Sequence, residues 1–184
     1  ALGGKGVIFH LGSHRGRGLA EVVAQIVTTL GSIAEAAPAS VLTVIENSAG
    51  MGGSIGSKLE ELGEITKQLP KDRVKICLDT QHLFAAGYPI HESAGLDQFM
   101  AEFNAKVGLD RLVALHCNDS KIALGGGVDR HENIGDGLIG SSGIKNLTHH
   151  AALQDLPFLL EVPGVDHTGP DKDNVDRLKA LATV

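Results

Sequence analysis

Five short runs of apolar residues recur along the chain, and they constrain its fold more than any other feature. The runs cover residues 6–10, 41–46, 74–79, 112–116 and 157–161. Continuous apolar runs of this length, too short for helices, are typical of parallel strands that are buried on both faces. Successive runs end 36, 33, 37 and 45 residues apart, which is the length of a unit made of one strand and one helix.

The segments between these runs carry apolar side chains at helical spacing. This pattern predicts helices at residues 19–36, about 57–68, 96–107, 141–153 and 171–182. Strands that alternate with helices indicate an α/β fold built on a parallel sheet. A chain of 184 residues without a linker or low-complexity stretch is expected to form a single domain over residues 1–184.

Composition narrows the class of protein. The chain is 42% apolar, but no uninterrupted apolar run approaches the roughly 18 residues of a membrane span, so we expect no membrane partner. Cys77 and Cys117 lie in or beside apolar runs and read as reduced core thiols. We therefore expect a cytoplasmic protein, or a nuclear or mitochondrial one if the source is eukaryotic. The net charge of −6 does not predict a basic face, although bound divalent ions would reverse the charge of a carboxylate-rich cleft.

Each of the five runs ends in a residue type that binds metal ions. In parallel α/β folds, functional groups gather at the carboxyl ends of the strands. The chain places His10, Glu46, Asp79, His116 and Glu161 at these ends. Imidazoles and carboxylates without a thiolate suit zinc, manganese or iron, and they exclude a structural cysteine-type zinc site.

Further candidate ligands follow two of the runs. His82 lies three residues after Asp79, where we expect the strand to turn into a loop. Asp129 and His131 lie in a glycine-bracketed loop after the fourth run, and side chains two residues apart point the same way in extended backbone. They can therefore share one ion. Such a set exceeds the needs of one ion and indicates a polynuclear site, the kind that clamps the attacking and leaving oxygens of a phosphoryl group.

The glycine-rich loop at residues 50–56 matches no nucleotide-binding pattern. Read as G-x-G-x-x-G from Gly50 it has Ile55 in the last position, and read as a phosphate loop it has Ser57 where lysine is needed. It is either a plain flexible connection or a loop whose backbone approaches a bulky substrate.

Taken together, the motifs resemble endonuclease IV, the zinc-dependent apurinic/apyrimidinic endonuclease family of base-excision repair. The resemblance rests on VIFHLGSH (7–14), VIENSAGMGGSIG (44–56), CLDTQHLFAAGY (77–88), HCNDSK (116–121), VDRHENIGDGLIG (128–140) and FLLEVPG (158–164). It implies a (β/α)₈ TIM barrel of the endonuclease IV and xylose isomerase-like type. It also implies up to three Zn²⁺ ions, with Mn²⁺ as a possible substitute.

The resemblance assigns roles residue by residue. Glu46 would bridge two ions, with His10 on one of them, while Asp79, His116 and Glu161 would complete the other; His82, Asp129 and His131 would hold the third. Glu46, Asp79 and Glu161 are the expected catalytic carboxylates. Arg130, Asn47, Gly50 and Gly52 lie where the family meets the DNA backbone.

The implied reaction is hydrolysis of duplex DNA 5′ to an abasic site by a metal-activated hydroxide, which leaves a 3′-hydroxyl and a 5′-deoxyribose phosphate. The matched motifs cover only strands four to eight of the family's barrel, about five of its βα units. An open sheet edge favours pairing, so we expect a missing N-terminal segment or a second copy to cover the edges. The alternatives are another metal-dependent barrel, such as a sugar isomerase or epimerase, and a non-catalytic remnant.

Overall fold

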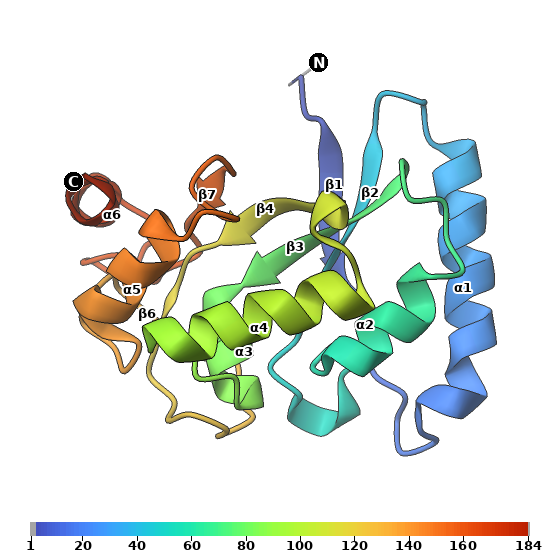
Figure 1. The fold of residues 1–184 in the computed structure, drawn as a ribbon, viewed down its shortest axis with the longest axis horizontal. Coiled ribbons are helices and arrows are strands. Elements are labelled where there is room, and N and C mark those ends of the chain that lie inside the picture. The colour runs from blue at the N-terminus through green and yellow to red at the C-terminus, as the bar shows by residue number, and fades with distance from the viewer. Residues whose placement is uncertain (1–2, 184) are drawn as a thin grey trace.

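A five-stranded parallel sheet forms the centre of the protein, seen in a computed structural model that describes residues 3–183 (Figure 1). Its strands are β1 (Gly6–His10), β2 (Leu42–Glu46), β3 (Val74–Asp79), β4 (Leu112–His116) and β7 (Phe158–Leu159). Each strand pairs with the next one along the chain, in the order β1-β2-β3-β4-β7. This sequential order is that of a barrel wall, because a doubly wound sheet reverses direction at a switch point. The strands β1 and β7 are its open edges.

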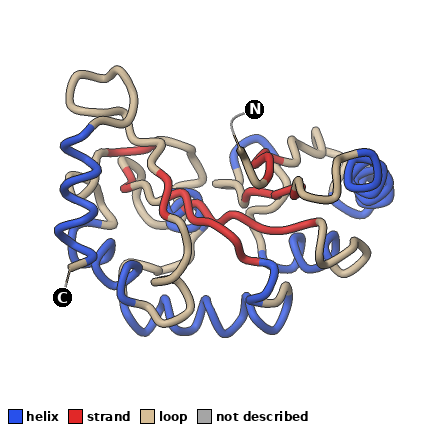
Figure 2. Tube along the Cα trace, turned by 90° about the horizontal axis from the view of Figure 1, so that it is seen from above, coloured by secondary structure: helices blue, strands red, loops and turns tan. Residues whose placement is uncertain are grey.

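Helices follow the strands and cover the sheet. Figure 2 shows them along one side and at the two ends of the row of strands. They are α1 (Leu19–Ala36), α2 (Leu59–Thr66), α3 (Thr80–Ala86), α4 (Ser93–Lys106), α5 (Gly140–His149) and α6 (Lys172–Ala182), with 3₁₀ turns η1 (Met51–Gly53) and η2 (Leu109–Arg111). The predicted alternation of strand and helix is therefore confirmed.

Three segments near the ligand-type residues differ from the sequence-based expectation. The segment after β3, expected to be a loop, is the helix α3, because Asp79 caps its first turn and Gly87 ends it in a left-handed conformation. The long loop after β4 contains a short antiparallel pair, β5 (Asp119–Ser120) with β6 (His131–Glu132). The strand β7 is also shorter than its apolar run and ends two residues before Glu161.

The two faces of the sheet bury different sets of residues. The helix-covered face forms the main core, in which Ile45 and Ile76 are fully buried. The opposite face carries a smaller apolar cluster of Val44, Cys77 and Ala114, with Ile8 packed against it. Side chains two residues apart in a strand share a face. Each residue of this layer therefore lies directly beneath the ligand-type residue at the end of its own strand.

The helix α1 is long and apolar enough to cross a membrane by length and composition, with a mean hydropathy of 1.3 over 18 residues. In this fold it packs on the sheet through Val22, Leu30 and Ala34. Only 17% of the helix window is buried, and an apolar groove next to it runs along β1, where Val7 is 61% exposed. The exposed apolar side chains of α1 thus lie beside β1, the strand at the open edge of the sheet.

Candidate metal centre

The parallel register places four ligand-type residues side by side at the carboxyl ends of the strands. His10 pairs with Glu46 across β1 and β2, and Asp79 pairs with His116 across β3 and β4. All four lie at the carboxyl ends of their strands, on the face opposite the helices. Glu161 follows β7 by two residues and reaches the same group.

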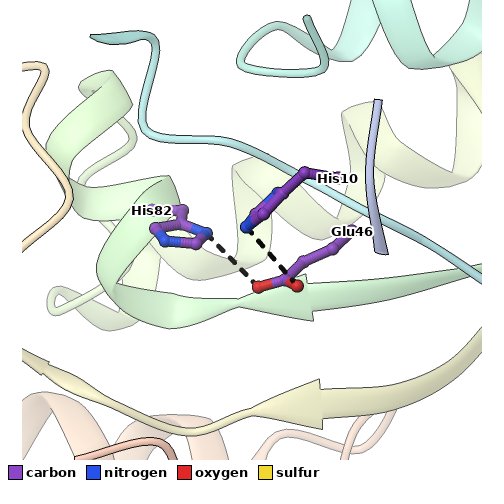
Figure 3. A group of neighbouring side chains, drawn as sticks. All are labelled: His10, Glu46 and His82. Atoms are coloured by element: carbon purple, nitrogen blue, oxygen red, sulfur yellow. Dashed lines mark ion pairs between the residues drawn. The ribbon is translucent and has the colours of Figure 1, made fainter. Parts of the chain in front are cut away.

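The first group consists of His10, Glu46 and His82 (Figure 3). The Glu46 carboxylate lies between the two imidazoles, with 3.7 Å from its Oε2 to His10 Nε2 and 3.4 Å from its Oε1 to His82 Nδ1. Glu46 and His82 are buried, whereas the side chain of His10 is 45% exposed. One side of this group therefore faces solvent.

The second group contains Asp79, His82 and His131, with Asp129 beside it. The Nε2 atoms of His82 and His131 both lie 3.3 Å from the Asp129 carboxylate, and His131 Nε2 lies 3.6 Å from Asp79 Oδ2. The helix α3 makes this arrangement possible, because Asp79 Oδ1 accepts a hydrogen bond from the His82 backbone N–H at 2.9 Å. His82 is thus held by a helix turn and not by the expected loop.

The third group contains Glu46, Asp79, His116 and Glu161. His116 Nδ1 lies 3.0 Å from Glu46 Oε1, 3.1 Å from Glu161 Oε2 and 4.0 Å from Asp79 Oδ2. Asp79 is fully buried, whereas the Glu161 side chain is 48% exposed. This group therefore has a buried floor and one carboxylate at its rim.

The three groups overlap. Glu46 belongs to the first and third groups, Asp79 to the second and third, and His82 to the first and second. In each group the ligand atoms lie within 4.8 Å of one another. The arrangement is thus one connected centre in which each pair of groups has one residue in common.

The histidine hydrogen bonds fit a metal ion. His82 Nδ1 lies 3.0 Å from the backbone oxygen of Asn47, and His131 Nδ1 lies 3.0 Å from that of Glu161. Because a carbonyl oxygen only accepts, each Nδ1 donates, so in the neutral imidazole that binds a metal each Nε2 carries the lone pair. Both Nε2 atoms are buried and have no assigned hydrogen bond among residues 3–183, although each lies 3.3 Å from the Asp129 carboxylate. Two bare imidazole nitrogens beside carboxylates form a suitable donor set for zinc.

The carboxylates of the centre favour positive charge nearby, and they raise the pKa of two neighbouring histidines. Burial by itself lowers the pKa of His82, but the charges of Asp79 and Asp129 outweigh it and raise that pKa to about 9. The pKa of His116 is likewise raised despite burial, through hydrogen bonds with Cys77 and the neighbouring carboxylates. Burial in turn raises the pKa of Asp79. A divalent cation would therefore compete with the protons on the imidazoles of His82 and His116.

The residues expected to contact DNA are placed differently from one another. Arg130 is exposed and its guanidinium donates to the backbone oxygen of Asp129 at 2.8 Å. Gly50 and Gly52 have positive φ angles of 92° and 62° in the loop after β2. Asn47 is only 1% exposed, and its side chain hydrogen-bonds the backbone of Asp79. A DNA contact by the Asn47 side chain would require this packing to open.

The sequence-based expectations did not include the role of Asn118. Its buried side chain donates to Asp79 Oδ2 at 2.6 Å and accepts from the Glu161 backbone N–H at 2.8 Å. Its position two residues after His116 was a weak signal, because polar residues commonly follow strands. Only the tertiary contacts reveal what it holds.

A cavity of about 280 Å³ opens beside the first group. The loops after β1 and β2 form its outer wall, where Ser13 Oγ donates to the Gly52 carbonyl at 2.7 Å. Ser48 also lines the cavity, and its buried Oγ has no hydrogen-bond partner in the described part of the chain. The cavity gives a small polar group access to His10 and His82.

Comparison with known proteins identifies the family. A sequence model of the xylose isomerase-like TIM barrel family matches residues 1–182. The chain belongs to this family. The sequential parallel sheet is therefore part of a TIM-barrel-type α/β fold, as expected.

Relatives within the family support the resemblance to endonuclease IV. A protein from Halothermothrix orenii named probable endonuclease 4 is 40% identical over 167 residues, which cover 90% of this chain and 59% of that protein. The crystal structure of endonuclease IV from Thermus thermophilus matches with a TM-score of 0.77 at 30% identity, over 98% of this chain and 62% of that one. The chain thus spans about three fifths of the length of these relatives.

A second solved structure shows how widely the fold is shared. A D-tagatose 3-epimerase-like protein matches with a TM-score of 0.68 at 21% identity, over 96% of this chain and 60% of that chain. Identity this low supports the common fold alone. The choice between chemistries therefore depends on the residues of the centre.

Proposed function

We propose that the protein is a metal-dependent apurinic/apyrimidinic endonuclease that hydrolyses the phosphodiester 5′ to an abasic site in duplex DNA. The observation that carries this proposal is the connected centre of three ligand groups. Relatives named endonuclease 4 at 36–41% identity support the same class of reaction. The proposal concerns the whole enzyme, of which this chain resembles about three fifths.

The donor set supports zinc as the metal. Glu46 would be shared between two ions, Asp79, His116 and Glu161 would complete one of them, and His10 would serve the other. The remaining candidates, His82, Asp129 and His131, would hold a third ion, with Mn²⁺ as a possible substitute. Bound ions of this kind neutralise phosphate charge and make water acidic enough to supply hydroxide near neutral pH.

The chain's own residues divide into a fixed floor and an accessible rim. Glu46 and Asp79 are buried and hydrogen-bonded or ion-paired, so their carboxylates are held in fixed positions. His10, Asp129 and Glu161 have side chains 45–48% exposed, so they are the candidate ligands that a substrate meets first. A phosphodiester can approach the rim without displacing the floor.

We propose that abasic geometry, more than overall charge, determines affinity for DNA. The chain has 16 lysines and arginines against 22 acidic residues, which limits the counterion-release contribution to binding. A duplex that lacks a base is more easily kinked and unstacked, and this deformability favours access to a recessed centre. Arg130, Gly50 and Gly52 remain our proposed backbone contacts. Undamaged duplex should bind weakly even at low salt.

The second candidate function is that of a sugar isomerase or epimerase with the same fold. The epimerase-like structural match supports it at the level of fold. The group of Asp79, His82 and His131 with Asp129 favours the endonuclease instead, because chemistry on one or two ions needs no third set of ligands. A non-catalytic remnant would keep the ligands and lack incision.

The decisive experiment incubates the zinc-loaded chain with a labelled duplex that bears one abasic site. We expect a single incision that yields a 3′-hydroxyl and a 5′-deoxyribose phosphate, and its loss after chelation. An undamaged duplex and the His167→Ala variant, which alters an exposed histidine outside the three ligand groups, are the controls. The chain could also bind zinc without incising DNA, even when it is supplied with the N-terminal part of a relative. That result would favour the non-catalytic alternative.

A further inference from the structure

Asn118 lies at the junction of three strands. It follows β4 by two residues and is completely buried. Its Nδ2 donates to Asp79 Oδ2 at 2.6 Å on the β3 side, and its Oδ1 accepts the Glu161 N–H at 2.8 Å on the β7 side. One side chain thus connects two candidate ligands that come from opposite sides of β4.

The orientation of this amide is fixed. A carboxylate oxygen only accepts and a backbone N–H only donates, so the nitrogen and oxygen of Asn118 cannot be exchanged. Its backbone is fixed as well, because Thr80 Oγ1 donates to the Asn118 carbonyl at 2.6 Å and accepts from its N–H at 2.9 Å. Thr80 is the first residue of α3, directly after Asp79.

Glu161 depends on this contact more than the other ligands do. His10, Glu46, Asp79 and His116 all lie within strands, where the sheet ladder holds their backbone. Glu161 lies beyond the end of β7, so the ladder does not reach it. The Asn118 side chain holds its N–H, and His131 Nδ1 donates to its carbonyl at 3.0 Å.

We propose that Asn118 is a positioning residue that sets Asp79 and Glu161 for metal binding. This inference rests on the proposed function, because it takes both carboxylates to be ligands. Asn118 directs Asp79 Oδ2 through a short hydrogen bond and fixes the point from which the Glu161 side chain leaves the backbone. It touches no substrate and acts only through these two residues.

The effect of removing Asn118 follows from what it leaves unpaired. The buried Asp79 Oδ2 and the partly buried N–H of Glu161 would both lose their partner. Asp79 could then rotate and Glu161 could shift, so both ligands would have to be ordered again when an ion binds. Loss of such outer partners typically weakens metal binding by about 10–100-fold.

Zinc affinity is the measurement, made by titrating Zn²⁺ against a chromophoric chelator into the metal-stripped chain well below its melting temperature. We expect Asn118→Ala to weaken the tightest zinc site by about 10–100-fold. Asn118→Asp is nearly isosteric and opens no cavity, so it is a second test of the same contact. It keeps an acceptor for the Glu161 N–H but places a second carboxylate against Asp79, and we expect it to lose affinity as well.

Asn174 provides a matched control. It is equally buried, donates from Nδ2 to the carboxylate of Asp171 at 2.9 Å, and accepts the Ile134 N–H at 2.9 Å. It therefore makes the same kinds of hydrogen bond, with a further one to Asn133 Oδ1 at 3.0 Å, but it hydrogen-bonds none of the candidate ligands. Asn174→Ala should lower the melting temperature comparably and leave zinc affinity unchanged.

Two results would overturn the inference. One is parental zinc affinity in both Asn118 variants, and the other is an equal loss in Asn174→Ala, which would indicate general loosening. Zinc affinity is independent of DNA cleavage. A parent chain that binds zinc but does not incise abasic DNA would contradict the proposed function while the contrast between Asn118 and Asn174 still supports the positioning role.

Discussion

Asn47 and Asp79 are joined by two hydrogen bonds between a side chain and a backbone. Asn47 Oδ1 accepts the Asp79 N–H at 2.6 Å, and Asn47 Nδ2 donates to the Asp79 carbonyl at 3.3 Å. The last register pair of β2 and β3 is Glu46 with Cys77, so this amide continues the connection between the strands past the end of the ladder. Asp79 is thereby tied to β2 beyond the last register pair of these two strands, while its pairing with His116 ties it to β4.

Asn47→Ala should therefore act on stability. The substitution leaves the buried N–H of Asp79 unpaired, whereas the Asp79 carbonyl still accepts the first hydrogen bond of α3, and we expect a loss of about 1–3 kcal/mol in the free energy of unfolding. Urea denaturation measures it, with the exposed Asn104→Ala as the control. If the Asn47→Ala variant kept the parental free energy of unfolding but bound DNA more weakly, the result would support the expected DNA contact of Asn47.

Metal content is the next prediction. We expect two to three zinc ions per chain after gentle purification, because the three ligand groups form one connected centre. Chelation should lower the melting temperature, since a ligand present at about 1,000 times its Kd stabilises the folded state by about 4 kcal/mol. Elemental analysis combined with thermal melts tests both points. The absence of any transition metal would count against the centre, and a single magnesium would favour a different barrel enzyme.

Two ligand substitutions should differ in severity. His131→Ala removes one imidazole, whose side chain is 15% exposed, so we expect loss of one ion with the fold nearly intact. Glu46→Gln should remove more zinc, because Glu46 belongs to two of the three groups. Both should slow incision on the order of 100-fold or more, beyond the usual effect of outer partners. Incision at the parental rate by both variants would show that the ligand assignment is wrong.

The pH dependence of α6 gives a prediction away from the centre. Asp171 accepts the Val165 N–H at 2.6 Å and the Asn174 N–H at 2.9 Å, and these bonds lower its pKa to about 2. A lowered pKa stabilises the fold above the unfolded value of 3.8, and this contribution is lost as the pH falls from there towards 2. Asp171→Ala should thus lower the melting temperature at pH 7 and have little effect near pH 2.

Thermal melts from pH 7 to pH 2 measure this difference. Asp173→Ala, in the first turn of the same helix and exposed, is the control. A constant difference between Asp171→Ala and the parent across the whole range would show that the Asp171 charge contributes nothing.

The open edges should make the chain associate. The outer sides of β1 and β7 lack a strand partner in the described residues, and the groove beside β1 is apolar. Such edges pair readily, so we expect a second copy or an N-terminal segment to cover them. Size-exclusion chromatography with light scattering should find the chain larger than a monomer. A stable monomer that incises abasic DNA would show that neither is needed.

Local pattern was enough to predict most of the fold. The strands at residues 6–10, 74–79 and 112–116 and the helix at residues 19–36 have the predicted bounds, because continuous apolar runs and helical spacing are local signals. The helix α3 was missed although its signals were present, with Asp79 as its cap and Gly87 at its end. The capping aspartate is itself the last residue of β3, and the direct passage from strand to helix made the segment resemble a loop.

Long-range contacts account for what sequence reasoning did not find in the centre. The sequence alone predicted that the five ligand-type residues at the strand ends lie close together, because the carboxyl ends of parallel strands meet on one side of the fold. Asn47 and Asn118 could not, since their partners lie 32, 39 and 43 residues away and neither side chain has the chemistry of a ligand. A buried amide next to a carboxylate becomes visible only once the chain has folded.

The brevity of β7 determines where the centre can open. This strand pairs with β4 at only two register positions, Leu115 with Phe158 and His116 with Leu159, and it has a free outer edge. Local unfolding starts in segments with few protecting contacts. Backbone amides of residues 158–161 should thus exchange with deuterium long before those of β3. Glu161 can leave with this segment while Glu46 and Asp79 stay in place, which provides an exit route for an ion that does not require unfolding of the sheet.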